Sequence, residues 1–105
     1  MKIAMPLAEA RVAELSDDCE RFTIVDVDLT ENRILDSCRA EPDAEWLGRL
    51  AVWLAEQAVD LVIAVEVGPE MKTDLMESSI RIIAGAPNDP PHSVIKSYLA
   101  GDLDR

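Results

Sequence analysis

The sequence predicts a single-domain α/β protein in which a five-stranded mixed sheet carries helices on its faces. A length of 105 residues suits one domain, residues 1–105, and 49% hydrophobic residues are enough for its core. Three expected strands come first, followed by helix, strand, helix, strand and helix. The fourth strand is a continuous apolar run, which is typical of parallel pairing inside a sheet covered on both faces.

The first expected strand is short and leads into a long connection. Residues 1–5 are apolar, and Pro6 is expected to end the strand because proline has no N–H for a ladder. Residues 7–20 form an acidic connection that is long for a small domain, and long connections are often functional. A short helical turn over residues 8–15 is compatible with this composition.

The second and third strands are expected to form a hairpin. Arg21–Asp28 alternates between apolar and polar side chains, which is the pattern of a strand with one buried face. Leu29–Asn32 is a suitable turn because Asn32 tolerates positive φ. Arg33–Ala40 is then the returning strand.

Pro42 and Asp43 are expected to open the first helix, with the Asp43 carboxylate as its N-cap. Leu61–Val65 follows as the buried strand. One broad apolar helix face is predicted from helical spacing, made of Trp46, Leu47, Leu50, Ala51, Trp53, Leu54 and Ala58.

The last three elements complete two strand–helix units, and their crossovers should be right-handed. Gly68–Glu70 begins a helix, since proline suits the first helical position. Ile80–Ala84 is the last strand. Ser93 is expected to cap a final helix that Gly101 ends. The buried residues of the middle helix are expected to be Met71, Leu75 and Met76.

The formal net charge of −11 excludes several classes of partner. Such a surface repels phosphate backbones and anionic membranes, so no nucleic acid and no membrane partner is expected, whereas a basic protein partner is compatible. No secretory signal and no apolar span of about 20 residues is recognised, which leads us to expect a cytoplasmic protein. In that compartment, thiols stay reduced.

Five segments of the chain are similar to one known family. They are residues 1–6, 12–22, 59–63, 67–69 and 94–103. In order and spacing they resemble the nitrogenase iron–molybdenum-cofactor biosynthesis family, or dinitrogenase iron–molybdenum cofactor domain. The resemblance implies a ribonuclease-H-like fold and a cleft for a metal cluster at the strand ends.

The chain departs from the family pattern at three places. Leu15-Ser16-Asp17 stands where the family usually has His-Phe-Gly, and leucine cannot replace a histidine ligand. Val65-Glu66 stands where two glycines are usual, and Glu66 adds a negative charge that disfavours an anionic cluster. Ala58 replaces a further glycine.

Cys19 is the principal candidate ligand, because it matches a cysteine found in part of the family and thiolates bind iron–sulfur and molybdenum centres well. Gly68 and Pro69 are expected to contact the cluster through the helix start. Cys38 and His92 are secondary metal ligands. Each has a simpler interpretation, namely packing for the cysteines, a surface position for His92 and a plain turn at Gly68.

These residues and the resemblance together predict a metal-cluster carrier or accessory protein rather than an enzyme. Its cargo is expected to be an iron–sulfur or iron–molybdenum cluster, bound transiently and exchanged with a protein partner, by a monomer or weak homodimer. The first strand lacks the carboxylate that a metal-dependent nuclease needs, and no catalytic triad spacing is present. The alternatives are a protein-interaction or regulatory module that has lost the cluster, and a small-molecule or anion binder that uses the same cleft.

Overall fold

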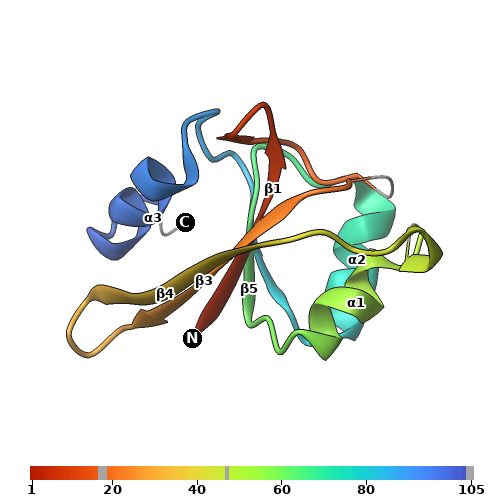
Figure 1. Ribbon diagram of the computed structural model, residues 1–105, viewed down its shortest axis with the longest axis horizontal. Helices are drawn as coiled ribbons and strands as arrows, with labels where there is room; N and C mark the ends of the chain where they lie inside the picture. Colours follow the sequence, from red (N-terminus) through yellow and green to blue (C-terminus); the bar gives the residue numbers. More distant parts are fainter. Residues whose placement is uncertain (17–18, 47, 104–105) are drawn as a thin grey trace.

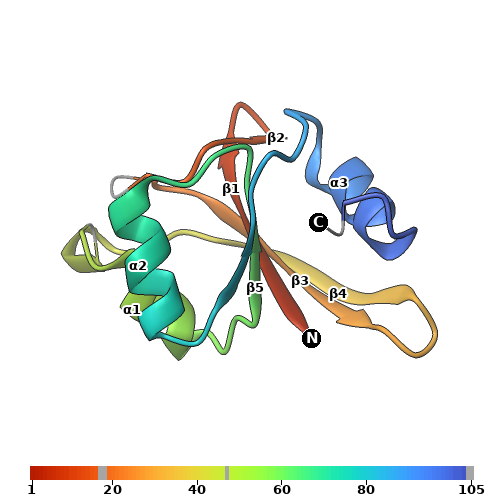
Figure 2. The same ribbon diagram turned by 180° about the vertical axis from the view of Figure 1, so that it is seen from behind.

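The structure is a computed structural model that describes residues 1–16, 19–46 and 48–103. Its described residues form a mixed six-stranded sheet in the order β4-β3-β1-β5-β6, with β2 paired to β1. Helices α1 and α2 cover one face and α3 covers the other (Figures 1 and 2). The strands are β1 (Lys2–Ala8), β2 (Arg11–Val12), β3 (Phe22–Asp28), β4 (Arg33–Ala40), β5 (Leu61–Ile63) and β6 (Arg81–Ile83). The helices are η1 (Ala44–Trp46), α1 (Leu50–Glu56), α2 (Pro69–Glu77) and α3 (Pro91–Leu99).

Strand β1 is the centre of the sheet and joins its two halves. On one side β1 is antiparallel to β3, with Ile3 opposite Val25. On the other side it is parallel to β5, with Ile3 opposite Leu61. Strand β4 extends the antiparallel half, and β6 extends the parallel half. The prediction of a mixed α/β sheet with helices on its faces is therefore confirmed.

Pro6 does not end β1, contrary to the sequence prediction. It lies within the strand, opposite Phe22. The carbonyl of Pro6 accepts a hydrogen bond from the N–H of Ala13 at 3.0 Å, on the side of β1 away from β3. A backbone N–H at this position would point to that same side, beyond the last β5 pair at Ala4. Proline therefore removes no bond from the ladder.

The number of strands exceeds the five that the sequence predicts because β1 turns back into β2. Glu9 and Ala10 adopt φ values of 54° and 64°, which is the left-handed pair that a tight hairpin turn requires. Leu7 then pairs with Val12 in an antiparallel ladder. The helical turn expected here is absent from the described residues. Neither turn residue is glycine or asparagine, so the usual sequence signal of such a hairpin is missing.

The helix expected from Pro42 and Asp43 is divided in two. A single 3₁₀ turn, η1, comes first, and α1 begins only at Leu50. Gly48 interrupts the helical path with a φ of 82°. The carbonyl of Asp43 accepts from the N–H of Trp46 at 2.9 Å, but α1 has no side-chain cap. Leu47, which the sequence placed on the apolar face, lies outside the described residues.

Several other local predictions can be compared with the structure. Asn32 has a φ of 58° in the β3–β4 turn, and Pro69 is the first residue of α2, as predicted. Met76 was expected in the core but is 71% exposed. Helix α3 begins at Pro91, two residues before the expected cap at Ser93.

None of the described helices has the length and apolar content of a membrane span.

Two hydrophobic cores lie on opposite faces of the sheet. Ala4 of β1 points into the core under α1 and α2, whereas Ile3 and Met5 point into the core under α3. In the first core the ring centroids of Phe22 and Trp53 are 5.4 Å apart, and the two ring planes are inclined by 44°. The alternation of side chains along a strand explains how one strand supplies both cores.

Candidate functional site

The candidate site lies beyond the carboxyl ends of the parallel strands. The segment after β2 runs beside the segment after β5. Val65 donates its N–H to the carbonyl of Ala13 at 3.0 Å, and Leu15 donates to Glu66 at 2.8 Å. Leu15 and Val67 form a parallel bridge. These bonds fix residues from two distant parts of the chain at one end of the sheet.

A third segment, which follows β6, holds the other side of the same loop. The N–H of Val12 donates to the carbonyl of Asp89 at 2.9 Å, and the Asn88 side-chain amide donates to the carbonyl of Val12 at 2.8 Å. Arg11 also donates from Nη1 to the carbonyl of Asn88 at 3.0 Å. The loop is therefore held from both sides, which gives the site a defined frame.

A hollow of about 400 Å³ lies in front of the start of α2. Gly68 is extended, with φ −64° and ψ 156°, and Pro69 occupies the first turn of α2. A Cβ built on Gly68 would meet nothing within 4 Å, so the fold itself does not demand glycine there. The hollow is lined by Glu14, Leu15, Ser16, Glu66, Gly68, Pro69, Glu70 and Met71.

Cys19 lines a second hollow, of about 420 Å³. Its thiol is half-buried, and Sγ donates to the carbonyl of Arg21 at 3.3 Å. Glu14 and Ser16 line both hollows, so the two lie next to each other. The hollow of the principal candidate, Cys19, therefore adjoins the hollow of the predicted contact residues at the start of α2. Asp17 and Asp18, which the sequence placed beside Cys19, lie outside the described residues.

The rim of the site is acidic. Glu14, Glu66 and Glu70 line the hollow before α2, and its described lining contains no lysine or arginine. The positive end of a helix macrodipole attracts anions with an energy of only about 0.3–1 kcal/mol at an exposed site. Three carboxylates oppose that attraction, so the helix start by itself gives an anion little net attraction at this hollow.

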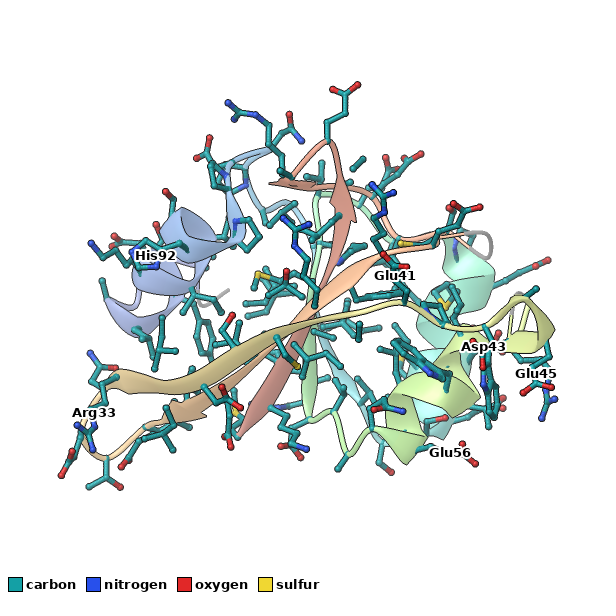
Figure 3. All side chains as sticks on the ribbon, viewed as in Figure 1. Arg33, Glu41, Asp43, Glu45, Glu56 and His92 are labelled. Carbon is teal, nitrogen blue, oxygen red and sulfur yellow. The ribbon has the colours of Figure 1, made fainter. Side chains whose placement is uncertain are left out.

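The two secondary candidates lie elsewhere. Cys38 is exposed on β4, opposite Ile24, and borders a small hollow with Lys2 and Gln57. His92 is exposed on α3, which covers the other face of the sheet (Figure 3). Neither cysteine forms a disulfide. Within the described ranges no group of three or more His, Cys, Asp or Glu side chains could hold a metal ion.

Leu15 occupies the position where the family usually has histidine. It is 2% exposed and belongs to the core under α1 and α2. Its neighbours Glu14 and Ser16 line the hollows and were not among the predicted site residues, nor was Glu70. Their positions in the sequence could have indicated them, because Glu14 and Ser16 lie in the long connection and Glu70 directly follows Gly68-Pro69.

Comparisons with known proteins place this chain in a family. The model of a family described as dinitrogenase iron-molybdenum cofactor matches residues 1–101. No curated protein matches the chain. The crystal structure of PH0822 is similar, with a TM-score of 0.87 and 19% identity over 99% of this chain and 93% of that one.

A candidate dinitrogenase from Methanocaldococcus jannaschii is also similar, in two structures. Its crystal structure gives a TM-score of 0.74 with 21% identity over 99% of this chain and 92% of that one. Its NMR structure gives 0.72 with 21% identity over 100% and 92%. At these identities the structures establish the fold, and the match over residues 1–101 establishes the family.

Proposed function

Because the chain belongs to the dinitrogenase iron–molybdenum cofactor family, we propose that it is an accessory protein that carries a metal cluster. The cargo is an iron–sulfur or iron–molybdenum cluster, held transiently and exchanged with a protein partner. One observation supports this proposal above the others. Cys19, a soft thiol ligand, lines a hollow that adjoins the start of α2.

Each predicted contact has a defined role in this proposal. The Cys19 thiolate binds one metal of the cluster, and the first N–H groups of α2 after Gly68 and Pro69 face its anionic sulfides. Cys38 lies on β4 and His92 on α3, and neither lines the hollows of Cys19 and Gly68, so we do not assign them to the same ligand set. The other coordination positions are therefore filled by ligands that travel with the cluster or belong to the partner.

Weak binding is suited to such a role, since a carrier must release its cargo. A single protein thiolate and the acidic rim of Glu14, Glu66 and Glu70 both keep the affinity for the cluster low.

In this role the protein catalyses no reaction. We also assign the sheet to the ribonuclease-H-like class, although the hollow lacks the converging metal-binding carboxylates of a nuclease among the described residues.

Anaerobic reconstitution tests the proposal. The protein is incubated with iron, sulfide and molybdate, desalted, and examined by metal analysis and visible absorption. The wild type is expected to retain metal with charge-transfer bands, and Cys19→Ala to lose most of it. Cys38→Ala is the matched control and should retain the wild-type amount. Equal retention by Cys19→Ala, or retention lost only in Cys38→Ala, would contradict the assignment of Cys19.

A protein-interaction module that has lost its cargo is the second candidate. The burial of Leu15 and the carboxylate of Glu66 favour it, because these residues stand where the family usually has a histidine and a glycine that would help to hold a cluster. This candidate predicts no retained metal in a protein that circular dichroism shows to be folded. Reconstitution and circular dichroism on the same sample therefore distinguish the two candidates.

A further inference from the structure

A hollow of about 710 Å³ follows strand β6 and shares no lining residue with the candidate site's two hollows. Strand β6 ends the strand order of the sheet, so one of its sides has no partner strand among the described residues. The lining comes from both faces of the sheet, since Lys72 and Met76 belong to α2 and Tyr98 belongs to α3. The hollow is therefore a groove that contains the edge of the sheet.

The backbone of β6 offers unused hydrogen-bonding groups to this groove. The N–H of Arg81 donates to Asp60, and the carbonyl of Ile83 accepts from Ala64, so both residues point their backbone groups toward β5. Successive residues of a strand point these groups to opposite sides. Ile82, and the next outward residue Ala84, consequently direct their N–H and C=O groups into the groove.

The charge of the groove differs from the charge of the whole protein. Its described lining includes Lys72 and Arg81 but no aspartate or glutamate. The chain has 21 acidic and 10 basic residues, so a lining with two cations and no carboxylate is unusual for this surface. The remaining lining is mainly apolar, with Ile82 and Ile83 half-buried. An anionic partner with apolar side chains is complementary to it.

We propose that β6 is a docking edge for an extended acidic segment of a partner protein, which pairs with β6 as an additional strand. Alternate side chains of that segment contact Lys72 and Met76 on one face and Tyr98 on the other. Its carboxylates lie near Lys72 and Arg81. This proposal does not depend on cluster binding, because none of the groove residues lines the candidate site.

A second copy of the chain is a poorer occupant. Two β6 strands in antiparallel contact would place Lys72 and Arg81 of both copies in one groove, and each copy has a net charge of −11. The opposite edge of the sheet is also a poorer docking site. Strand β4 has Arg33, Asp36 and Arg39 spaced along it, and charges of this kind protect an edge from added strands.

The experiment uses a synthetic seven-residue peptide of alternating glutamate and valine, blocked at both ends. It is titrated into ¹⁵N-labelled protein at low salt and followed by NMR. We expect the amide signals of Ile82 and Ala84 to shift most. Arg81→Glu should weaken binding about threefold to tenfold, because it replaces an attraction with a repulsion. Lys72→Glu should act in the same direction.

Arg39→Glu is the matched control, because Arg39 lies on β4, opposite Thr23, and does not line the groove. It should bind the peptide as the wild type does. A peptide with N-methyl groups on alternate residues keeps its charges but cannot pair as a strand, and it should lose binding.

Three outcomes would overturn the proposal. The first is an equal affinity for a lysine–valine peptide of the same length. The second is a set of shifts centred on β4 instead of β6. The third is a concentration-dependent dimer in sedimentation that Arg81→Glu does not affect and that excludes the peptide, which would assign the groove to a second copy.

Discussion

The N–H of Leu15 donates to the carbonyl of Glu66 over 2.8 Å, which joins the loop after β2 to the segment after β5. Leu15 is buried in the core, whereas its neighbours Glu14 and Ser16 line the hollows of the candidate site. Because successive side chains of an extended segment point to opposite sides, one residue anchors the loop and the flanking residues face the site. The position of Leu15 therefore determines the shape of the site.

Leu15→Ala should destabilise the protein by about 2–5 kcal/mol, because it removes buried methyl groups and leaves a cavity in the core. Urea unfolding followed by circular dichroism measures the change. Leu35→Ala is the control, since Leu35 is 52% exposed, and its effect should stay within about 0.5 kcal/mol. A Leu15→Ala effect as small as that of the control would show that the loop is not anchored by this side chain.

Ala58→Gly should stabilise the protein by about 0.5–1 kcal/mol. Ala58 follows α1 with a φ of 61°, a conformation that costs an L-residue about 1–2 kcal/mol and that glycine adopts freely. Part of the gain is offset by the greater freedom of glycine in the unfolded chain. Ala55→Gly, on the exposed side of α1, should instead destabilise by about 0.5–1 kcal/mol. Thermal unfolding of both variants measures the difference, and the same sign for both would refute the argument.

Gly85→Ala and Gly68→Ala should have opposite effects, although a Cβ would be in open space at either position. Gly85 has a φ of 87°, so alanine is strained there and the cost should be about 1–2 kcal/mol. Gly68 has a φ of −64°, so alanine fits and should be neutral or stabilise by up to about 1 kcal/mol.

Gly68→Ala has a second use, because it leaves the fold intact. Cluster retention by this variant in the reconstitution assay reports whether the cargo approaches the backbone of Gly68 closely. We expect retention to fall. Unchanged retention would place the cluster closer to Cys19 than to the start of α2.

Removing charge from the rim should strengthen cluster retention. The double variant Glu14→Gln and Glu66→Gln should retain about two to five times more cluster after desalting, because a unit charge about 4 Å away changes the energy by about 1 kcal/mol in water. The effect should decrease at high salt. Glu56→Gln on α1 is the control and should change nothing (Figure 3). A decrease in the double variant would mean that these carboxylates act as ligands.

The sequence predicts most of the fold because its strands carry strong local patterns. The alternation in Arg21–Asp28 and the apolar run at Leu61–Val65 each indicate a strand, and the structure has strands at Phe22–Asp28 and Leu61–Ile63. Asn32 marks the turn. The hairpin at Glu9 and Ala10 could not be predicted, since both residues adopt positive φ without the usual glycine or asparagine. Here, tertiary hydrogen bonds around Val12 outweigh local preference.

The candidate site is predicted less completely, because it depends on contacts between distant segments. Cys19 and Gly68 were selected separately, and their neighbouring hollows follow from the pairing of Leu15 with Val67, which no local pattern indicates. Cys38 and His92 were selected by residue type and by an expected position near the same end of the sheet. Their separation from the site follows from the sheet order and from the face that α3 covers.

The shared use of β1 by both cores has a consequence for cooperativity. Ala4 packs with the helices on one face, while Ile3 and Met5 pack with α3 on the other, so the loss of either layer removes packing from β1. A cavity made under α3, for example by Ile95→Ala, should then lower the unfolding midpoint reported by Trp53 on the opposite face. The protein is expected to unfold as a single unit, and the slowest amide protons in hydrogen exchange should belong to β1.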